Sequence, residues 1–236
     1  MALRREGYWD DHYKVELKNF DKHGDEGEIW FGLRLTRRII EQLLSRFNSQ
    51  KDITLLDIGC GNSALLCLLV ERLREKGLTH LEEKIKLVGI DYSKESIALA
   101  HRVVHSLNLE GRIILHQSDI LNPDSSKCFA SKYQYLVDKG TLDAICLLHG
   151  ETDDELNRAK ARYLESIYSI VEEGSVFILA SCNNTEEELL KLFDVKCNQR
   201  QVKLIGRIET PKITFGGKEG SQVCCIIVEF GHEIST

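Results

Sequence analysis

The sequence of 236 residues predicts an α/β fold in which a mostly parallel sheet carries helices on both faces and the last strand runs antiparallel. Short apolar runs typical of buried strands alternate with segments whose apolar residues recur at helical spacing. Repeated strand–helix units of this kind produce a parallel sheet. A glycine-containing loop follows the first strand and opens a helix. The two last strand runs are joined through a turn, which predicts the antiparallel end of the sheet.

The elements of the first half of the chain surround the glycine loop. They are, in order, a helix over 34–47, a strand over 53–56, a helix over 64–73, a strand over 84–90, a helix capped by Ser93 and a strand over 112–116. A mostly charged stretch over 75–84 stands before the second strand. We expect this stretch to form a lengthened surface loop.

The second half continues the same alternation. Its elements are a strand over 133–137, a helix over 156–171, a strand over 176–180, a helix after the Thr185 cap and two strands over 203–208 and 223–230. Gly174 is expected to end the long helix. Pro211 and a turn at Gly216 and Gly217 join the last two strands.

Composition predicts one domain over residues 1–236, with 1–33 as an N-terminal extension or lid. Apolar residues make up 42% and charged residues 29% of the chain, as in ordinary globular proteins. The net charge of −6 argues against nucleic-acid binding, and no apolar run is long enough to span a membrane. No Cys-x-x-Cys pair occurs, so we expect reduced, buried thiols and a cytoplasmic protein, with the nucleus also compatible. The thiols in apolar stretches are Cys60, Cys67, Cys146, Cys182, Cys224 and Cys225.

The glycine loop at residues 57–61 is the most informative feature for function. Gly59 and Gly61 stand where a side chain would block a ligand lying at the start of a helix. The spacing from Gly59 to Ala64 also fits a dinucleotide-binding loop. Asp57 separates the two interpretations, because a carboxylate there would repel the pyrophosphate of a dinucleotide and would stabilise a cationic sulfonium or ammonium.

Two further acids follow the next two strands. Asp91 is placed to accept hydrogen bonds from the hydroxyls of a ribose, and Asp119 is placed to accept one from the amino group of an adenine. The alternative for each acid is a solvated strand end or a helix cap. Three acids at successive strand ends together favour a nucleoside site.

These residues resemble a known family. The D-x-G-x-G loop, Asp91 and Ser118-Asp119 resemble the marks of class I S-adenosylmethionine-dependent methyltransferases. D-K-G-T-L-D at 138–143 is similar to the fourth-strand motif of a subset of protein lysine methyltransferases. Four further blocks are similar to the methyltransferase-like 10 group, the elongation factor 1-alpha lysine methyltransferases; they lie at 9–13, 24–32, 181–185 and 210–217.

The resemblance covers about residues 8–230 and carries specific expectations. It implies a Rossmann-like seven-stranded methyltransferase sheet of order 3-2-1-4-5-7-6, S-adenosylmethionine as cofactor, and elongation factor 1-alpha as protein substrate of a monomeric enzyme. The expected donor-binding residues are Trp30, Asp57, Gly59, Cys60, Gly61, Asn62, Asp91, Tyr92, Ser118, Asp119 and Ile120.

Asp138 is the predicted catalytic residue. A lysine acceptor must lose a proton before methyl transfer, and either the carboxylate or the backbone carbonyl of Asp138, at the end of the fourth strand, is placed to orient its amine. The alternative is that Asp138 caps the turn at Lys139 and Gly140. Lys139 is expected to point away from the donor, because its ammonium would repel the sulfonium. Asp143 is expected to be structural.

The segment over 24–32 combines glycines and acids with Trp30 and Phe31, which is poor for a regular element and suited to a lid. The alternative is that Trp30 packs a helix against the sheet. By resemblance, the segment folds over the donor and residues 214–217 form part of the rim of the acceptor channel.

Two other functions stay open, a methyltransferase of a small molecule or nucleic acid and a binding module without catalysis. The first is disfavoured because the fourth strand lacks the motif that holds a planar base amine. The second is disfavoured because all three strand-end acids are present. No metal is predicted, since His101 and His105 have helical spacing without a third ligand nearby.

Overall fold

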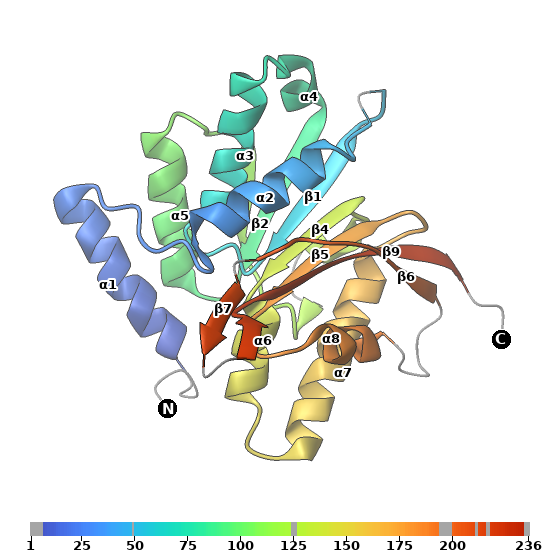
Figure 1. Cartoon of the computed structure of the whole chain (residues 1–236). Helices are drawn as coiled ribbons and strands as arrows, with labels where there is room; N and C mark the ends of the chain where they lie inside the picture. The colour runs from blue at the N-terminus through green and yellow to red at the C-terminus, as the bar shows by residue number, and fades with distance from the viewer. Residues whose placement is uncertain are drawn as a thin grey trace.

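The computed structural model describes residues 7–48, 50–123, 127–193, 200–210, 212–215 and 218–233. One seven-stranded sheet has the order β3-β2-β1-β4-β5-β9-β6, so the predicted order is confirmed, with β9 in place of the seventh strand (Figure 1). Its strands are β1 (Ile53–Ile58), β2 (Ile85–Asp91), β3 (Ile113–Gln117), β4 (Tyr135–Lys139), β5 (Val176–Ser181), β6 (Arg200–Arg207) and β9 (Cys224–Glu233). The first five are parallel, and β9 pairs antiparallel with both β5 and β6.

Helices cover both faces of the sheet. They are α1 (Tyr8–His23), α2 (Gly32–Leu44), α3 (Ala64–Glu75), α4 (Thr79–Lys84), α5 (Lys94–Ser106), α6 (Thr141–Leu148), α7 (Asp153–Ile170) and α8 (Glu186–Leu192). Apolar residues of α2, α3 and α5 form one core cluster with alternate strand residues such as Leu55. Residues of α6, α7 and α8 form the second cluster with the other strand residues, such as Leu56. Each central strand is therefore buried on both sides, as its apolar sequence predicts.

Two predicted helix caps are confirmed. The Ser93 hydroxyl accepts a hydrogen bond from the Ser96 amide at the start of α5. Thr185 and Glu188 form a reciprocal capping box at the start of α8. The long helix α7 ends at Ile170, four residues before the predicted stop at Gly174.

Three segments differ from the sequence prediction. Residues 79–84, predicted as surface loop, form α4, because Leu81 is buried and Glu82 pairs with Arg74 at 2.8 Å. Residues 8–23, predicted only as an extension, form α1, which packs against α5. Strands β7 (Lys212–Phe215) and β8 (Lys218–Ser221) form a separate hairpin. Pro211, Gly216 and Gly217 lie outside the described residues.

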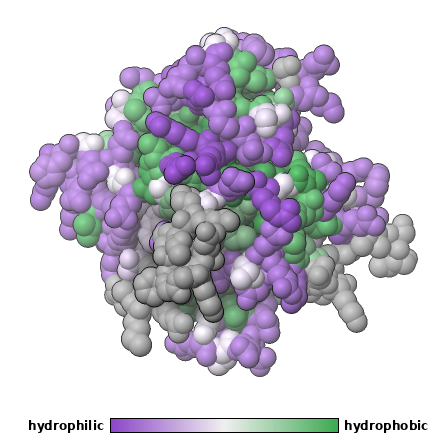
Figure 2. All heavy atoms as spheres, viewed as in Figure 1, coloured by the Kyte–Doolittle hydropathy of each residue, from purple (hydrophilic) through white to green (hydrophobic). Residues whose placement is uncertain are grey.

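The face drawn in Figure 2 is mostly hydrophilic, with smaller groups of hydrophobic residues among the hydrophilic ones. None of the helices in the described ranges has the length and apolarity that a membrane crossing needs. Cys60, Cys67 and Cys225 are buried, as predicted, whereas Cys146 and Cys224 are only half-buried. Cys182 is exposed, because it lies one residue beyond the end of β5 and does not continue its buried run.

Candidate functional site

A cavity of about 350 Å³ opens at the carboxyl ends of β1, β2 and β4. This is the end of a doubly wound sheet where ligands bind, and the volume lies in the range of small-molecule sites. Ten of the eleven predicted donor-binding residues line it, namely Trp30, Gly59, Cys60, Gly61, Asn62, Asp91, Tyr92, Ser118, Asp119 and Ile120. Asp57, the eleventh, is 3% exposed and does not line the cavity.

The glycine loop is held by close contacts with two helices. Gly59 and Gly61 have positive φ angles of 65° and 55°. A Cβ atom at Gly59 would lie 1.9 Å from the Thr141 hydroxyl oxygen, and one at Gly61 would lie 2.7 Å from the Tyr13 hydroxyl oxygen. Room for a ligand was the reason predicted for both glycines. The structure shows that the protein's own packing already requires them.

Asp91 connects the end of β2 to this loop. One carboxylate oxygen accepts a hydrogen bond from the Gly61 amide at 3.1 Å, and the other accepts one from the Ser93 amide at 2.9 Å. Burial raises the pKa of Asp91, while these two amides favour its charged form. Each carboxylate oxygen has a further lone pair, so the group can also accept from a bound hydroxyl.

Asp119 has a local role beside its place in the cavity wall. Its carboxylate accepts a hydrogen bond from the Leu121 amide at 2.8 Å, which closes the turn after β3. The Ser118 amide donates to the Asp91 carbonyl at 2.8 Å. The loops after β2 and β3 are therefore fixed to each other at the cavity.

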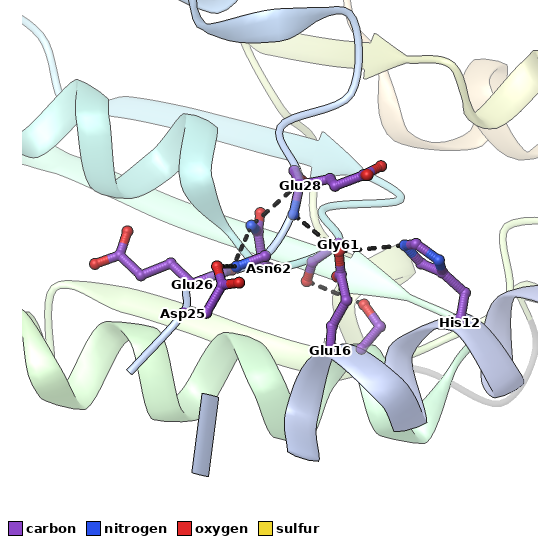
Figure 3. A network of polar contacts seen from close by, with 9 residues as sticks. His12, Glu16, Asp25, Glu26, Glu28, Gly61 and Asn62 are labelled. Atoms are coloured by element: carbon purple, nitrogen blue, oxygen red, sulfur yellow. Dashed lines mark hydrogen bonds and ion pairs between the residues drawn. The ribbon is translucent and has the colours of Figure 1, made fainter. Parts of the chain in front are cut away.

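The segment between α1 and α2 lies against the glycine loop (Figure 3). The Asn62 side-chain amide donates to the carbonyls of Glu26 at 2.7 Å and Glu28 at 3.4 Å. From the other side, the Glu16 carboxylate accepts a hydrogen bond from the Glu28 amide at 2.8 Å. The chain between the two helices is thus bound both to α1 and to the loop.

Three aromatic side chains of the N-terminal region line the cavity. They are Trp9, Tyr13 and Trp30, and the rings of Trp9 and Trp30 meet edge to face at 4.7 Å. The indole nitrogen of Trp30 is buried without a hydrogen-bond partner among the described residues. Because a buried orphan donor is costly, it fits a site that is completed by a ligand. Trp30 was predicted either to belong to a lid or to pack a helix against the sheet. It shows features of both, since it packs on Trp9 of α1 and forms part of the cavity wall.

Asp138 does not fit the predicted catalytic role of its carboxylate. The side chain is fully buried and does not line the cavity. It accepts hydrogen bonds from the Thr141 amide at 2.8 Å, the Leu142 amide at 3.1 Å and the Tyr163 hydroxyl at 2.6 Å. Burial raises its pKa to about 7, against the lowering effect of these donors. The structure favours the alternative in which Asp138 caps the turn into α6.

Lys139 faces the cavity, so the prediction that it points away from the donor site is wrong. Successive side chains point to opposite faces of a strand. At the end of β4 the Asp138 side chain points toward Tyr163 of α7, so that of Lys139 points to the other face, beside the cavity. The Lys139 ammonium donates to the Trp30 carbonyl at 3.0 Å. Burial lowers the pKa of Lys139, while the charges of Asp57 and Asp138 raise it. Burial raises the pKa of Asp57 to about 7, and Lys139 counteracts this.

The opposite wall of the cavity comes from α6, which the sequence prediction omitted. Ala144, Ile145 and Leu148 line it, together with His149. The helical spacing of these residues after the D-K-G-T motif could have been used to predict α6 from the sequence. Asp143 of the same helix accepts hydrogen bonds from the Ser181 hydroxyl and the Cys182 amide, so its predicted structural role is confirmed.

Comparisons with known proteins agree with this geometry. A family model described as a methyltransferase domain matches residues 49–223. "EEF1A lysine methyltransferase 2" of Mus musculus is 33% identical over 97% of this chain and 84% of its own length. "Protein-lysine N-methyltransferase EFM4" of Saccharomyces cerevisiae is 30% identical over 93% of this chain and 90% of its own.

Solved structures share the fold at low sequence identity. A S-adenosylmethionine-dependent methyltransferase from Clostridium acetobutylicum covers 93% of this chain and 99% of its own, with a TM-score of 0.56 at 14% identity. Magnesium protoporphyrin IX methyltransferase from Synechocystis, solved with bound donor, covers 92% of this chain and 96% of its own, with a TM-score of 0.52 at 14% identity.

Proposed function

The chain belongs to the methyltransferase domain family, and from this premise we propose that it is a protein-lysine N-methyltransferase that uses S-adenosylmethionine and acts on elongation factor 1-alpha. The substrate is inferred from the similarity to relatives that are named for methylation of that factor. They are 32–33% identical over 93–97% of this chain. The yeast relatives are named protein-lysine N-methyltransferases.

The cavity residues fit the parts of this donor. S-adenosylmethionine supplies a methyl group that is activated by a positive sulfur. In the proposed arrangement Asp91 accepts from the ribose hydroxyls, Ser118 to Ile120 hold the adenine, and the loop at Gly59 holds the methionine part. The carboxylates of Asp91 and Asp119 in the wall favour a cationic ligand, while the charge of the Lys139 ammonium is offset by the buried Asp57 beside it.

The acceptor lysine must reach the cavity uncharged. Removing its proton at neutral pH costs about 4–5 kcal/mol from an ordinary pKa of about 10.4. Burial between aromatic walls lowers that pKa, and a neighbouring positive sulfur lowers it further. Trp9, Tyr13 and Trp30 provide such walls for the aliphatic stem. The reaction therefore needs no dedicated strong base, and the Asp138 carboxylate is not assigned to it.

We further propose that the enzyme acts as a monomer in the cytoplasm, on a protein and not on nucleic acid. Free thiols in the described residues support a reducing compartment. The net charge of −6 suits a basic protein segment better than a phosphate backbone.

Incubation of the purified protein with labelled S-adenosylmethionine tests the function. One reaction contains purified elongation factor 1-alpha and another contains a whole-cell lysate, with the Asp91→Ala variant in parallel. We expect label on a lysine of the elongation factor, located by mass spectrometry, and none with the variant. Label on RNA or on a small molecule would instead support a methyltransferase of a nucleic-acid or small-molecule acceptor. Donor binding without any transfer would support the inactive binding module.

A further inference from the structure

Three side chains of the kinds that bind metals converge beside the donor cavity. His12 and Glu16 lie one turn apart on α1, and Glu28 lies on the segment that follows (Figure 3). One ligand atom from each of the three lies within 4.8 Å of the others. The sequence prediction of no metal depended on His101 and His105, which have no third ligand nearby. Here the third ligand comes from a loop twelve positions after Glu16.

A second observation points to a ligand at this place. Glu16 is 7% exposed, and its oxygen Oε2 is buried without a hydrogen-bond partner among the described residues. Its other oxygen accepts from the Glu28 amide and lies 3.3 Å from His12 Nε2. That nitrogen is also buried, and its contact with Glu16, dashed in Figure 3, is an ion pair without the geometry of a hydrogen bond, of which it has none within the described ranges. A buried carboxylate oxygen without a donor is costly, and a cation would remove the cost.

The surroundings favour a small cation over a side chain from a partner. Glu16 Oε2 and His12 Nε2 are both closed to water, so a long lysine or arginine side chain from outside does not reach them. Glu28 is exposed, and its carboxylate can close over an ion from the solvent side. One imidazole and two carboxylates form a ligand set that suits Zn²⁺, and a water on the exposed side at Glu28 would supply the fourth ligand.

We propose that His12, Glu16 and Glu28 form a zinc site that ties helix α1 to the segment over the donor cavity. The proposed role of the site is structural, because none of its three side chains is among the residues assigned to binding the donor or the acceptor. Glu28 lines the cavity. A metal on its carboxylate would therefore fix one part of the wall in addition to the hydrogen bond between Glu16 and the Glu28 amide.

Titration of metal-free protein with ZnCl₂ by calorimetry tests the site, together with the melting temperature with and without zinc. Thiols are common zinc ligands and Cys182 is exposed, so all proteins carry Cys182→Ser to exclude binding there. We expect one zinc per chain and a higher melting temperature. Because Glu28→Gln removes a direct ligand, it should weaken zinc binding at least about 10-fold.

Glu26→Gln is the matched control, because Glu26 is exposed on the same segment and its carboxylate is outside the cluster. It should bind zinc like the parent protein. His12→Gln provides a second ligand variant that does not depend on Glu28. Zinc binding of equal strength in Glu28→Gln, His12→Gln and Glu26→Gln would overturn the proposal. The same holds if the parent protein binds no zinc and its melting temperature does not change.

Discussion

The ammonium of Lys139 donates a hydrogen bond to the main-chain carbonyl of Trp30 at 3.0 Å, across 109 positions of the sequence. Both residues line the donor cavity, one from the end of β4 and the other from the segment before α2. This bond fixes the N-terminal segment to the motif that follows the fourth strand.

Lys139→Met should therefore weaken donor binding. Loss of a hydrogen bond from a charged group costs about 1.5 kcal/mol or more. Donor affinity should fall by up to about 10-fold, the value reached if the whole of that cost falls on the donor-bound state. Calorimetric titration with S-adenosylhomocysteine measures it. Lys132→Met is the control, because the exposed Lys132 makes the same kind of bond, to the Ser169 carbonyl at 2.8 Å, away from the cavity. Equal affinities in the two variants would contradict this role of Lys139.

Replacement of Asp91 by Ala should weaken donor affinity by about 1.5–3 kcal/mol, because a buried, charged acceptor for the ribose hydroxyls is removed. Some stability should also be lost, since the carboxylate accepts from the Gly61 and Ser93 amides. Titration of the folded variant with S-adenosylhomocysteine gives the affinity, and urea unfolding gives the stability. A folded variant with unchanged affinity would remove the ribose assignment.

A methyl group at Gly59 should destabilise the protein even in the absence of a ligand. The Cβ atom would meet the Thr141 hydroxyl at 1.9 Å, and the φ of 65° adds backbone strain. We expect Gly59→Ala to cost about 2–4 kcal/mol from strain and overpacking together. Gly77→Ala is the matched control, because Gly77 has a φ of 68° and nothing within 4 Å of its added Cβ.

The difference between the free energies of unfolding of the two variants, measured in urea, gives the cost of the contact with Thr141. The double variant Gly59→Ala/Thr141→Ala should recover part of this difference, since it removes the clashing hydroxyl. A Gly59→Ala variant as stable as Gly77→Ala would show that the contact relaxes without cost.

Asp138→Asn should lower stability and keep the turnover of each folded molecule. The amide replaces one acceptor oxygen by a donor, so one of the Thr141, Leu142 and Tyr163 donors loses its partner. A buried unsatisfied group of this kind costs about 1–3 kcal/mol. Melting temperature and methylation rate, measured on one preparation, separate the two effects. A normal melting temperature with a slow rate would return Asp138 to the reacting centre.

Stability should depend on pH through Asp57. Burial raises its pKa to about 7 in the folded state, whereas the unfolded chain has an ordinary value of about 3.9. The folded state therefore binds the proton more tightly between these values. The contribution of Asp57 to the free energy of unfolding falls as the pH rises from about 4 to 7, and it levels off above. Urea unfolding between pH 5 and 8 should show a decline in the parent protein that is smaller in Asp57→Asn. Parallel curves for the two proteins would contradict the raised pKa.

Periodicity and motifs predict the sheet and most of the donor wall, and they fail where a choice between faces is needed. The strands follow from buried apolar runs, so β1 to β5 are found within one or two residues of their predicted bounds, whereas their order in the sheet was implied by the family resemblance. Lys139 lines the cavity and the Asp138 side chain does not, the reverse of the predicted orientations, because alternation along a strand does not tell which of two neighbours faces the cavity. Helix α1 was missed because its buried face is formed by spaced aromatics, Trp9, Tyr13 and Phe20, inside a strongly charged sequence.

The contact of Tyr13 with Gly61 bears on where this chain can be truncated. The region that matches the methyltransferase domain begins at residue 49, so a fragment cut there would keep the sheet and lose Trp9, Tyr13 and Trp30. One wall of the cavity would open to solvent, and Gly61 would no longer need to be bare on that side. A glycine is still expected at position 61 in homologues with a different N-terminal region, because its φ of 55° favours glycine whatever lies beside it.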